Sequence, residues 1–476
     1  MPIEYSTSDH SVSERDTLAE AATRLDRNPL ALVFVTDPDG RVAGRVTPQD
    51  VEAALSRGAK RDAKVTAAMA PVGSGDDGVL PVLDSAKKLA GLRTPVGARK
   101  IPIAEPTLGG NELRYVTECV ETNWISSQGS FVRRFEAEFA ARLGVPHALA
   151  VSNGTVALHL ALAAFGIGPG DEVIVPDLTF AATINAVVYT GATPVIVDIA
   201  PDTWSMDSDA FAAAITPRTK AVIPVHLYGQ PADMDPICAI AKRRGIFVVE
   251  DAAEAVGSKL DGTPCGAIGD CGTFSFYSNK LITTGEGGMV VFKDDAVAAR
   301  ARMLRDHGMN PAKRYWHDEV GFNYRLTNLQ AAIGCAQLEQ IDGFLARKKS
   351  IAARYLSRFA GTAEIECPHA VEGFDNSFWV FSVAVDRGKV DLDRDALIER
   401  LSTAGIDSRP LFYCLHEMPP YRGYAGNRAF PVAKRLSDSG LSLPSSTSIR
   451  DEEIDFVAGT FKRIVAARRL VRAIAA

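Results

Sequence analysis

The sequence lacks the cysteine patterns that mark disulfide scaffolds and zinc sites. Its seven cysteines are scattered along 476 residues, their number is odd, and no two of them form a Cys-x-x-Cys pair. Disulfide-rich secreted domains and zinc ribbons both need closely spaced sets of cysteines. We therefore expect reduced thiols in a cytoplasmic protein that has no metal site.

The sequence also lacks a strong bias of charge. It has 52 Lys and Arg residues against 58 Asp and Glu, a formal net charge of −6, and the two signs are interspersed. Nucleic-acid surfaces and polybasic membrane anchors need concentrated positive charge. The composition, 46% hydrophobic and 23% charged, is that of a soluble globular protein without nucleic acid or membrane as a partner.

No segment has the features of a secretory signal or a membrane span. Residues 1–9 are polar and acidic, without the basic and apolar regions of a secretory signal. Residues 178–197 contain no charged side chain, but Thr, Asn, Tyr, Gly and Pro interrupt the run. This polarity suits a buried helix followed by a strand better than a bilayer span.

Residues 1–99 are expected to form a separate first unit. Its expected elements are a helix over 17–25, strands over 31–36 and 41–46, and a helix that begins after Thr47 with Pro48 in its first turn. This order, with the segment Gly44–Asp50, resembles a CBS motif. A hairpin over 79–92 resembles a second CBS motif more weakly. Because only the hairpin of this second motif is present, the pair of CBS motifs looks truncated.

The CBS resemblance implies a nucleotide site at Thr47 and Asp50, because the Thr and Asp of this motif often hold a nucleotide ribose. A nucleotide-sensing regulatory protein is therefore one alternative function for the chain. The competing interpretation is that Thr47 caps the helix and Asp50 completes its first turn. We favour the capping interpretation, since the module is incomplete.

From about residue 100, apolar strands alternate with helices. The expected strands are 148–151, 172–175, 194–197, 221–225 and 246–250, and the expected helices between them are 155–165, 179–189 and 234–244. This alternation predicts an α/β fold with a mostly parallel sheet that is covered by helices on both faces. Functional sites in such sheets lie at the carboxyl ends of the strands.

After about Leu326 the pattern changes to that of a smaller α+β domain. It begins with one long helix over 330–359 and ends with a basic helix over 451–473, whose charges are most simply a solvated face. The predicted division is an N-terminal module over 1–99, a large α/β domain over 100–340 and a small C-terminal domain over 341–476.

One lysine stands out between two apolar runs. A strand over 273–277 is followed by a polar loop with Lys280, a Gly-rich turn over 285–288 and a second apolar run over 289–292. A lysine between two buried strands is unlike a solvated surface charge. Our hypothesis is that Lys280 carries a carbonyl cofactor as a Schiff base.

Other candidates also follow strands. Small residues at Gly154 and Thr155 open a helix whose N–H groups can seat a phosphate. Asp251 directly follows a buried strand, where an acid needs a cation such as a protonated pyridine nitrogen. Phe180 can stack on a ring, and the Ser275 hydroxyl can donate to a phosphate. Each residue alone also has an ordinary explanation: a capped helix, an ion pair, a core aromatic or a lysine that reaches solvent.

The order and spacing of these residues resemble fold-type I pyridoxal-phosphate enzymes, and more closely the DegT/DnrJ/EryC1/StrS family of nucleotide-sugar aminotransferases. The resemblance covers about residues 101–470. The segments that carry it are Trp124–Gly129, Ser152–Thr155, Glu250–Ala255, Ser275–Lys280 and Gly285–Gly288.

The resemblance implies pyridoxal 5'-phosphate as cofactor and a role for each candidate. Lys280 would form the Schiff base and later move a proton, and Asp251 would pair with the pyridine nitrogen. Glu254, where many relatives have Gln, would lie near the ring hydroxyl. Gly154, Thr155 and Ser275 would hold the phosphate, and Phe180 would stack on the ring. Asn323 would reach the phosphate in the other subunit of a homodimer.

Two further segments sharpen the implied substrate. Residues 305–334 and 407–421 resemble family members that aminate C4 of a GDP-linked 4-keto-6-deoxy sugar such as GDP-4-keto-6-deoxymannose. Glutamate is the implied amino donor, and surface polysaccharide is the implied destination. Cys414 departs from the expected Pro. Amination at C3, or of a UDP- or dTDP-linked keto sugar, stays open as an alternative.

Overall fold

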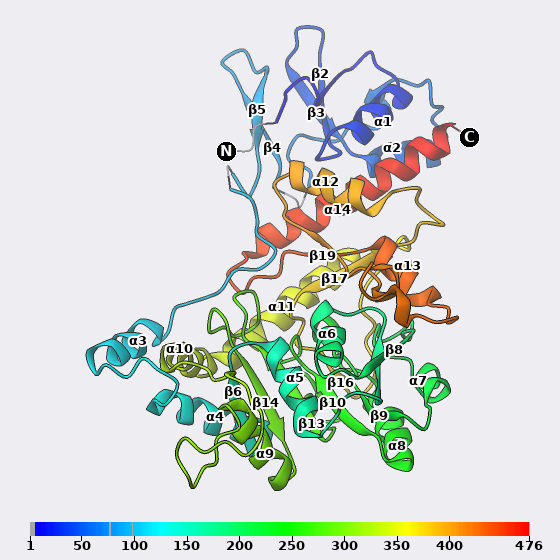
Figure 1. Ribbon diagram of the computed structural model, residues 1–476. Coiled ribbons are helices and arrows are strands. Elements are labelled where there is room, and N and C mark those ends of the chain that lie inside the picture. Colours follow the sequence, from blue (N-terminus) through cyan, green and yellow to red (C-terminus); the bar gives the residue numbers. More distant parts are fainter. Residues whose placement is uncertain (1–4, 76–77, 98, 476) are drawn as a thin grey trace.

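The computed structural model describes residues 5–75, 78–97 and 99–475 (Figure 1). A large α/β body occupies the lower part of the view, and the N-terminal unit lies at the top. The C-terminal helix α14 (Asp451–Ala475) runs between them. Within the described ranges, no helix has both the length and the apolar character needed to cross a membrane.

A seven-stranded sheet forms the centre of the body, in the order β6-β14-β13-β10-β9-β7-β8. All pairs are parallel except those of β14, which runs antiparallel to both β13 and β6. The predicted mostly parallel sheet is therefore confirmed. The strands are β6 (His147–Val151), β7 (Glu172–Pro176), β8 (Thr193–Val197), β9 (Thr219–Val222), β10 (Phe247–Asp251), β13 (Cys271–Ser275) and β14 (Gly288–Phe292).

Helices cover both faces of this sheet, because alternate strand residues point to opposite cores. Val290 belongs to one apolar cluster, and its neighbours Met289 and Val291 belong to another. The first face carries α5 (Gly154–Ala164), α6 (Ala181–Tyr189) and α9 (Asp295–Arg305). The second carries α4 (Ser130–Leu143), α7 (Ser208–Ala214), α8 (Met234–Arg244) and α10 (Asn328–Leu338), with α3 (Glu112–Glu121) packed against α10.

The prediction of one long helix over 330–359 is wrong. Two helices stand there, α10 and α11 (Ile341–Phe359), with a break at Gln340. They pack on different partners, since α10 lies against α3 and α4 whereas α11 lies against α14. The Gln340 side chain donates to Glu112 Oε1 and to the carbonyl oxygen of Ala336, which fixes the break. No Gly or Pro marks this point in the sequence.

The N-terminal unit has the expected order of elements. Strand β1 pairs in parallel with β2, β2 pairs antiparallel with β3, and β4 and β5 form a separate hairpin. Thr47 and Asp50 form a capping box at the start of α2, with the Thr47 N–H and hydroxyl both donating to Asp50 Oδ2. The elements are β1 (Ser11–Ser13), α1 (Leu18–Arg27), β2 (Val33–Thr36), β3 (Val42–Val46), α2 (Pro48–Ser56), β4 (Leu80–Leu83) and β5 (Leu89–Arg93).

The C-terminal part holds a four-stranded antiparallel sheet in the order β15-β17-β19-β18. The domain boundaries at residues 99 and 340 stay a prediction. The sheet and its helices are β15 (Ile365–Glu366), β17 (Phe381–Val385), β18 (Arg409–Pro410), β19 (Gly440–Leu443), α12 (Arg394–Thr403) and α13 (Pro431–Ser439).

The basic side of α14 is not the solvated face that we expected. Arg463 is buried and its Nε donates to the Leu30 carbonyl oxygen of the N-terminal unit. Arg469 pairs with both Glu52 and Glu364. Apolar residues of α14 share one core with the N-terminal unit and the small sheet. The charged side chains of α14 therefore connect the N-terminal unit to the C-terminal part. Composition alone does not distinguish such a helix from one whose charges face solvent.

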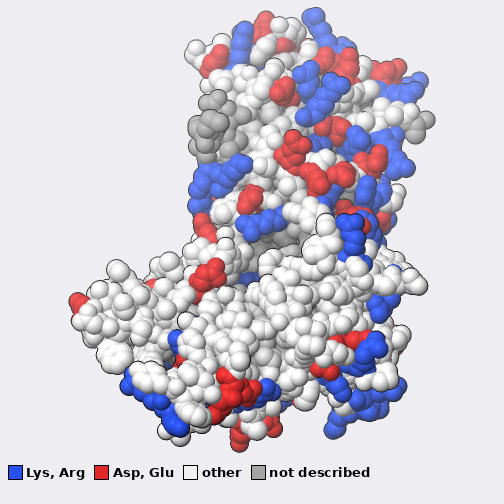
Figure 2. Space-filling view, in the orientation of Figure 1, with Lys and Arg blue, Asp and Glu red and all other residues white. Residues whose placement is uncertain are grey.

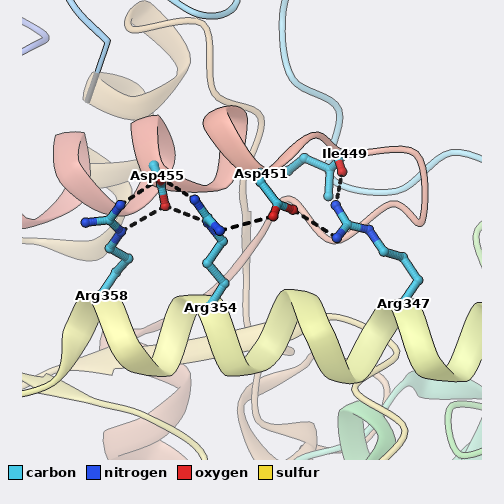
Figure 3. Close-up of polar contacts among 6 residues, drawn as sticks. All are labelled: Arg347, Arg354, Arg358, Ile449, Asp451 and Asp455. Carbon is cyan, nitrogen blue, oxygen red and sulfur yellow. Dashed lines mark hydrogen bonds and ion pairs between the residues drawn. The ribbon is translucent and has the colours of Figure 1, made fainter. Parts of the chain in front are cut away.

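Helix α11 contacts α14 through a row of ion pairs (Figure 3). Arg354 and Arg358 both reach Asp455, at 2.6 and 2.7 Å, and Arg354 also reaches Asp451. Arg347 pairs with the same Asp451 and donates to the Ile449 carbonyl oxygen. Half-exposed pairs contribute little singly, but this network sets the register between the two helices.

Candidate active site

A cavity of about 680 Å³ lies between the carboxyl ends of β10 and β13 and the small domain. Of the eight residues predicted to bind the cofactor, seven line it. They are Gly154, Thr155, Phe180, Asp251, Glu254, Ser275 and Lys280. The structure thus brings together side chains from widely separated parts of the sequence at the edge of the sheet where sites were expected.

Lys280 projects into this cavity from the loop after β13. Its side chain is 12% exposed, with Nζ 3.3 Å from Glu254 Oε1. On its other side, Nζ lies 3.7 Å from the centroid of the Trp379 ring. Trp379 was not singled out from the sequence, because nothing local indicates that its ring reaches Lys280, about a hundred residues away.

Asp251 is the last residue of β10 and is 5% exposed. It accepts hydrogen bonds from Thr183 Oγ1 at 2.8 Å and from the Ala253 N–H at 3.2 Å. Burial raises the pKa of its carboxyl, which these bonds and the charge of Lys280 partly offset. A buried carboxyl beside a cavity suits a cationic ring nitrogen. Thr183, which holds it, was missed, although it lies one helical turn after Phe180.

A buried pair, His226 and Glu250, fixes the backbone at Asp251. His226 Nε2 and Glu250 Oε2 are 2.9 Å apart, and the Ala232 N–H donates to His226 Nδ1, so the ring proton lies on Nε2. Glu250 also accepts three backbone N–H groups from the loop 266–269. The His226 N–H donates to the Asp251 carbonyl oxygen. The end of β10 is therefore held rigidly.

Glu254 contacts both Lys280 and the backbone of Tyr228. Its Oε2 accepts the Tyr228 N–H at 2.9 Å. Burial raises the pKa of Glu254, and the charge of Lys280 counteracts that rise. The Tyr228 ring stacks on Phe412 at 5.3 Å between centroids, and its hydroxyl accepts the Phe412 N–H. Tyr228 and Phe412 also line the cavity, and neither was singled out from the sequence.

The start of α5 has the form of a phosphate seat. Asn153 caps the helix by accepting the Val156 N–H at 3.0 Å, and the N–H groups of the first turn point outward. A Cβ on Gly154 would lie 2.8 Å from Ser275 Cβ, so only glycine allows this close approach. The N–H groups of Gly154 and Thr155 and the hydroxyl of Ser275 fit a phosphate.

Phe180 lies just before α6 as its N-cap residue, not inside the helix as predicted. The extended backbone there turns the ring toward the cavity, where it is 59% exposed and 5.7 Å from the Phe412 centroid. Its stacking on a cofactor ring stays a prediction. Asn323 is exposed and does not line the cavity of its own chain, so its contact with the other subunit also stays a prediction.

Within the described residues, one group has the composition of a metal site. Ligand atoms of Asp177, Cys414 and His416 lie within 4.8 Å of one another. Both oxygens of Asp177 already accept hydrogen bonds from His416, one from its N–H and one from its ring Nδ1. These bonds account for the cluster as a clamp between β7 and the segment that carries Phe412.

Lys348 is a buried amine behind the cavity. It extends from α11, is 5% exposed, and donates from Nζ to the carbonyl oxygens of Trp379 at 2.7 Å and Ser445 at 2.5 Å. No carboxylate among the described residues pairs with it. Burial lowers the pKa of Lys348 to about 7.

This amine predicts a pH dependence of stability. Between pH 7 and 10.5 the unfolded chain keeps the Lys348 proton and the folded chain does not, so stability rises with pH across this window. The free energy of unfolding should rise by up to about 5 kcal/mol relative to Lys348→Met. Urea titrations at several pH values measure the difference. A parallel pH dependence in wild type and Lys348→Met would contradict the prediction.

The comparisons with known proteins agree with this geometry. The model of the DegT/DnrJ/EryC1/StrS aminotransferase family matches residues 106–462. The chain is 49% identical over 367 residues to the GDP-perosamine synthase of Caulobacter vibrioides, covering 77% of this chain and 98% of that protein. The GDP-perosamine synthase of Escherichia coli O157:H7 is 44% identical, with 75% and 96% covered.

A solved structure shows the same fold. The PLP form of the putative sugar aminotransferase Spr1654 from Streptococcus pneumoniae superposes with a TM-score of 0.72 at 30% identity. The match covers 79% of this chain and 99% of that chain. The shared part has the fold-type I α/β architecture, and the N-terminal unit lies outside the family match.

Proposed function

The chain belongs to the DegT/DnrJ/EryC1/StrS aminotransferase family, and on that premise we propose that it transfers the amino group of glutamate to C4 of a GDP-linked 4-keto-6-deoxy sugar, which gives GDP-perosamine. The names of the relatives support the nucleotide and the sugar. A cytoplasmic location is part of the proposal and fits the seven unpaired cysteines.

The observation that carries the proposal is the convergence of Lys280, Asp251 and the start of α5 on one cavity. The family cofactor is pyridoxal 5'-phosphate, which supplies a carbonyl for the amine and a ring that accepts electrons. Gly154, Thr155 and Ser275 would hold its phosphate, and Asp251 would hold its ring nitrogen. Side chains suited to the phosphate, the ring nitrogen and the carbonyl carbon of such a molecule therefore line one cavity.

Asp251, Lys280 and Glu254 would then have separate roles in the reaction. Asp251, kept from water and fixed by Thr183, would maintain positive charge on the ring nitrogen of the bound cofactor. Lys280 would take a proton from the amino-donor carbon and deliver it to the former carbonyl carbon of the cofactor, on the other side of the nitrogen that joins the two, as general base and then general acid. Glu254 lies beside Lys280. Its carboxylate would accept a hydrogen bond from the Lys280 amine and so return the amine to this position after the reaction. The same steps in reverse place the amino group on the keto sugar.

Arg409 is the cation we assign to the anionic part of the substrates. It lies on β18, lines the cavity and, with Lys280, makes up the basic residues of that lining. Arg409→Met should raise KM for glutamate or for the nucleotide sugar about 10- to 100-fold, because a charged hydrogen bond is lost. Steady-state kinetics measures this. Arg387→Met, exposed in a distant turn, is the control, and equal KM values in both variants would refute the assignment.

A homodimer with shared sites is part of the proposal. Figure 2 shows few charges across the middle of the large domain and several along its lower edge, whereas charges crowd the N-terminal part. Large apolar side chains are exposed on segments near this body. A subunit interface would cover them and bring Asn323 to the neighbouring cavity. The exposed set includes Leu108, Leu113, Val120, Trp124, Tyr189, Tyr315 and Trp316.

We also propose, as a secondary function, that the N-terminal unit is CBS-like and binds a nucleotide. The order β1-α1-β2-β3-α2 supports the likeness. A cavity of about 220 Å³ beside Thr47 is also lined by Lys462 of α14, which favours an anionic ligand. Asp50 does not line it, since its carboxylate serves the helix cap. Equilibrium dialysis with AMP and GDP tests this secondary proposal.

The direct test of the main proposal is amine transfer from glutamate across a panel of GDP-, UDP- and dTDP-linked 4-keto and 3-keto sugars. We expect the GDP-linked 4-keto-6-deoxy sugar to give the highest kcat/KM. A preference for another nucleotide or for C3 would replace the substrate assignment and leave the aminotransferase in place. A colourless protein that does not react with glutamate would overturn the enzymatic reading.

A further inference from the structure

Trp379 contacts the loop of Lys280 in two ways. Its ring face lies below the amine, with 3.7 Å between Nζ and the ring centroid. Its edge is fixed as well, because Nε1 donates to the carbonyl oxygen of Asn279 at 2.7 Å. Asn279 directly precedes Lys280. The indole therefore holds both the amine and the backbone from which the lysine extends.

Trp379 is held in turn from the side away from the cavity. Lys348 donates to the Trp379 carbonyl oxygen and to that of Ser445, and so ties the segment before β17 to the segment after β19. The neighbouring Phe378 has a positive φ of 50°, which a bulky residue adopts only under constraint. A buried amine is costly, so its retention at this point needs a reason.

We propose that Trp379 and Lys348 are positioning residues for Lys280. Lys348 fixes the backbone of Trp379, and the indole keeps the Lys280 amine at the cavity when it is not bonded to the cofactor. The inference rests on the proposed function only in taking Lys280 as the reacting amine. The small domain would thereby control the reactive group of the large one.

The physical basis is the conformational freedom of lysine. A lysine has four rotatable bonds, and the 3.3 Å contact with Glu254 alone is a weak restraint. An aromatic face attracts the ammonium form of the lysine. For a contact that water does not reach, this attraction raises the population of the contacting side-chain conformation about 2- to 30-fold. The ordinary alternative is that Trp379 only fills space between the domains, in which case any large apolar side chain would serve.

The first test uses the enzyme freed of cofactor, so it does not depend on the substrate. Limiting acetic anhydride is added at fixed pH, and acylation of Lys280 is quantified by mass spectrometry against exposed lysines. Trp379→Leu should raise the rate at Lys280 about 2- to 30-fold, because the ammonium form loses its partner. Trp379→Phe, which keeps a ring face, should change it less. Rates in Trp379→Leu equal to wild type would overturn the proposal.

The second test addresses Lys348 and has a matched control on the same helix. Lys348→Met should shift Lys280 acylation in the same direction as Trp379→Leu and lower kcat more than it raises KM. Lys349→Met removes an exposed amine that pairs with Asp375 and should change neither. If Lys348→Met does not fold, Lys348→Gln keeps one donor and replaces it. A Lys348 variant that matches Lys349→Met in both measurements would refute the role of Lys348.

Discussion

Lys280→Ala should lower kcat for amine transfer by about 10³-fold or more, because the chain loses both the amine that binds the carbonyl and the group that moves the proton. The cavity would keep its phosphate seat and Asp251, so the cofactor should still bind, but without the covalent bond to the protein. Borohydride reduction followed by mass spectrometry reports that bond at Lys280, and single-turnover kinetics with glutamate reports the rate.

Lys280→Arg and Lys349→Ala are the controls for this result. Arginine keeps the charge beside Glu254 but cannot form the carbonyl bond, so it should be as inactive as alanine. Lys349→Ala, on the surface of α11, should retain wild-type rates. Turnover in Lys280→Ala within about tenfold of wild type would remove Lys280 from the reaction.

Asp251→Asn should lower kcat/KM by about 10²- to 10³-fold. The amide keeps the size of the carboxyl and can still accept from Thr183, but it cannot offset a positive ring nitrogen. Breaking such a buried charge pair costs about 3 to 5 kcal/mol, a factor of about 10² to 10⁴, and the expected loss lies in the lower part of this range. The cofactor dissociation constant should also rise, and it can be measured by titrating the cofactor-free protein.

Thr183→Val separates the charge of Asp251 from its orientation. It removes one hydrogen bond to the carboxylate and leaves the charge, so a smaller loss of about 3- to 30-fold is expected. Asp251→Asn and Thr183→Val with equal effects would show that orientation, and not charge, is the contribution of Asp251. Unchanged kcat/KM in Asp251→Asn would refute its assignment to the ring nitrogen.

The sequence was sufficient for the α/β core because its strands are short, apolar and separated by capped helices. The last residue of β10 and the first turn of α5 could be located this way, and both lie at the predicted edge of the sheet. The break between α10 and α11 could not, because it depends on which helices each one packs against. No local residue signals that choice.

The site shows the same division. Lys280, Asp251 and Gly154 could be found because they stand in short segments whose residue order is characteristic of the family. Trp379 and Arg409 could not, since Trp379 contacts Lys280 from far away in the sequence and Arg409 lines the cavity from an equally distant segment. Short-range patterns identify the groups that react, whereas the groups that hold them are revealed only by the folded chain.

The position of α14 has a consequence for the N-terminal unit. The family match begins at residue 106, so the N-terminal unit lies outside it. In this chain, Phe461 and Leu470 lie in a core shared with that unit, and Arg463 donates to Leu30. A chain without that unit would expose that side of the helix to water. Removal of the unit should therefore turn an interior face of the helix into an outer one.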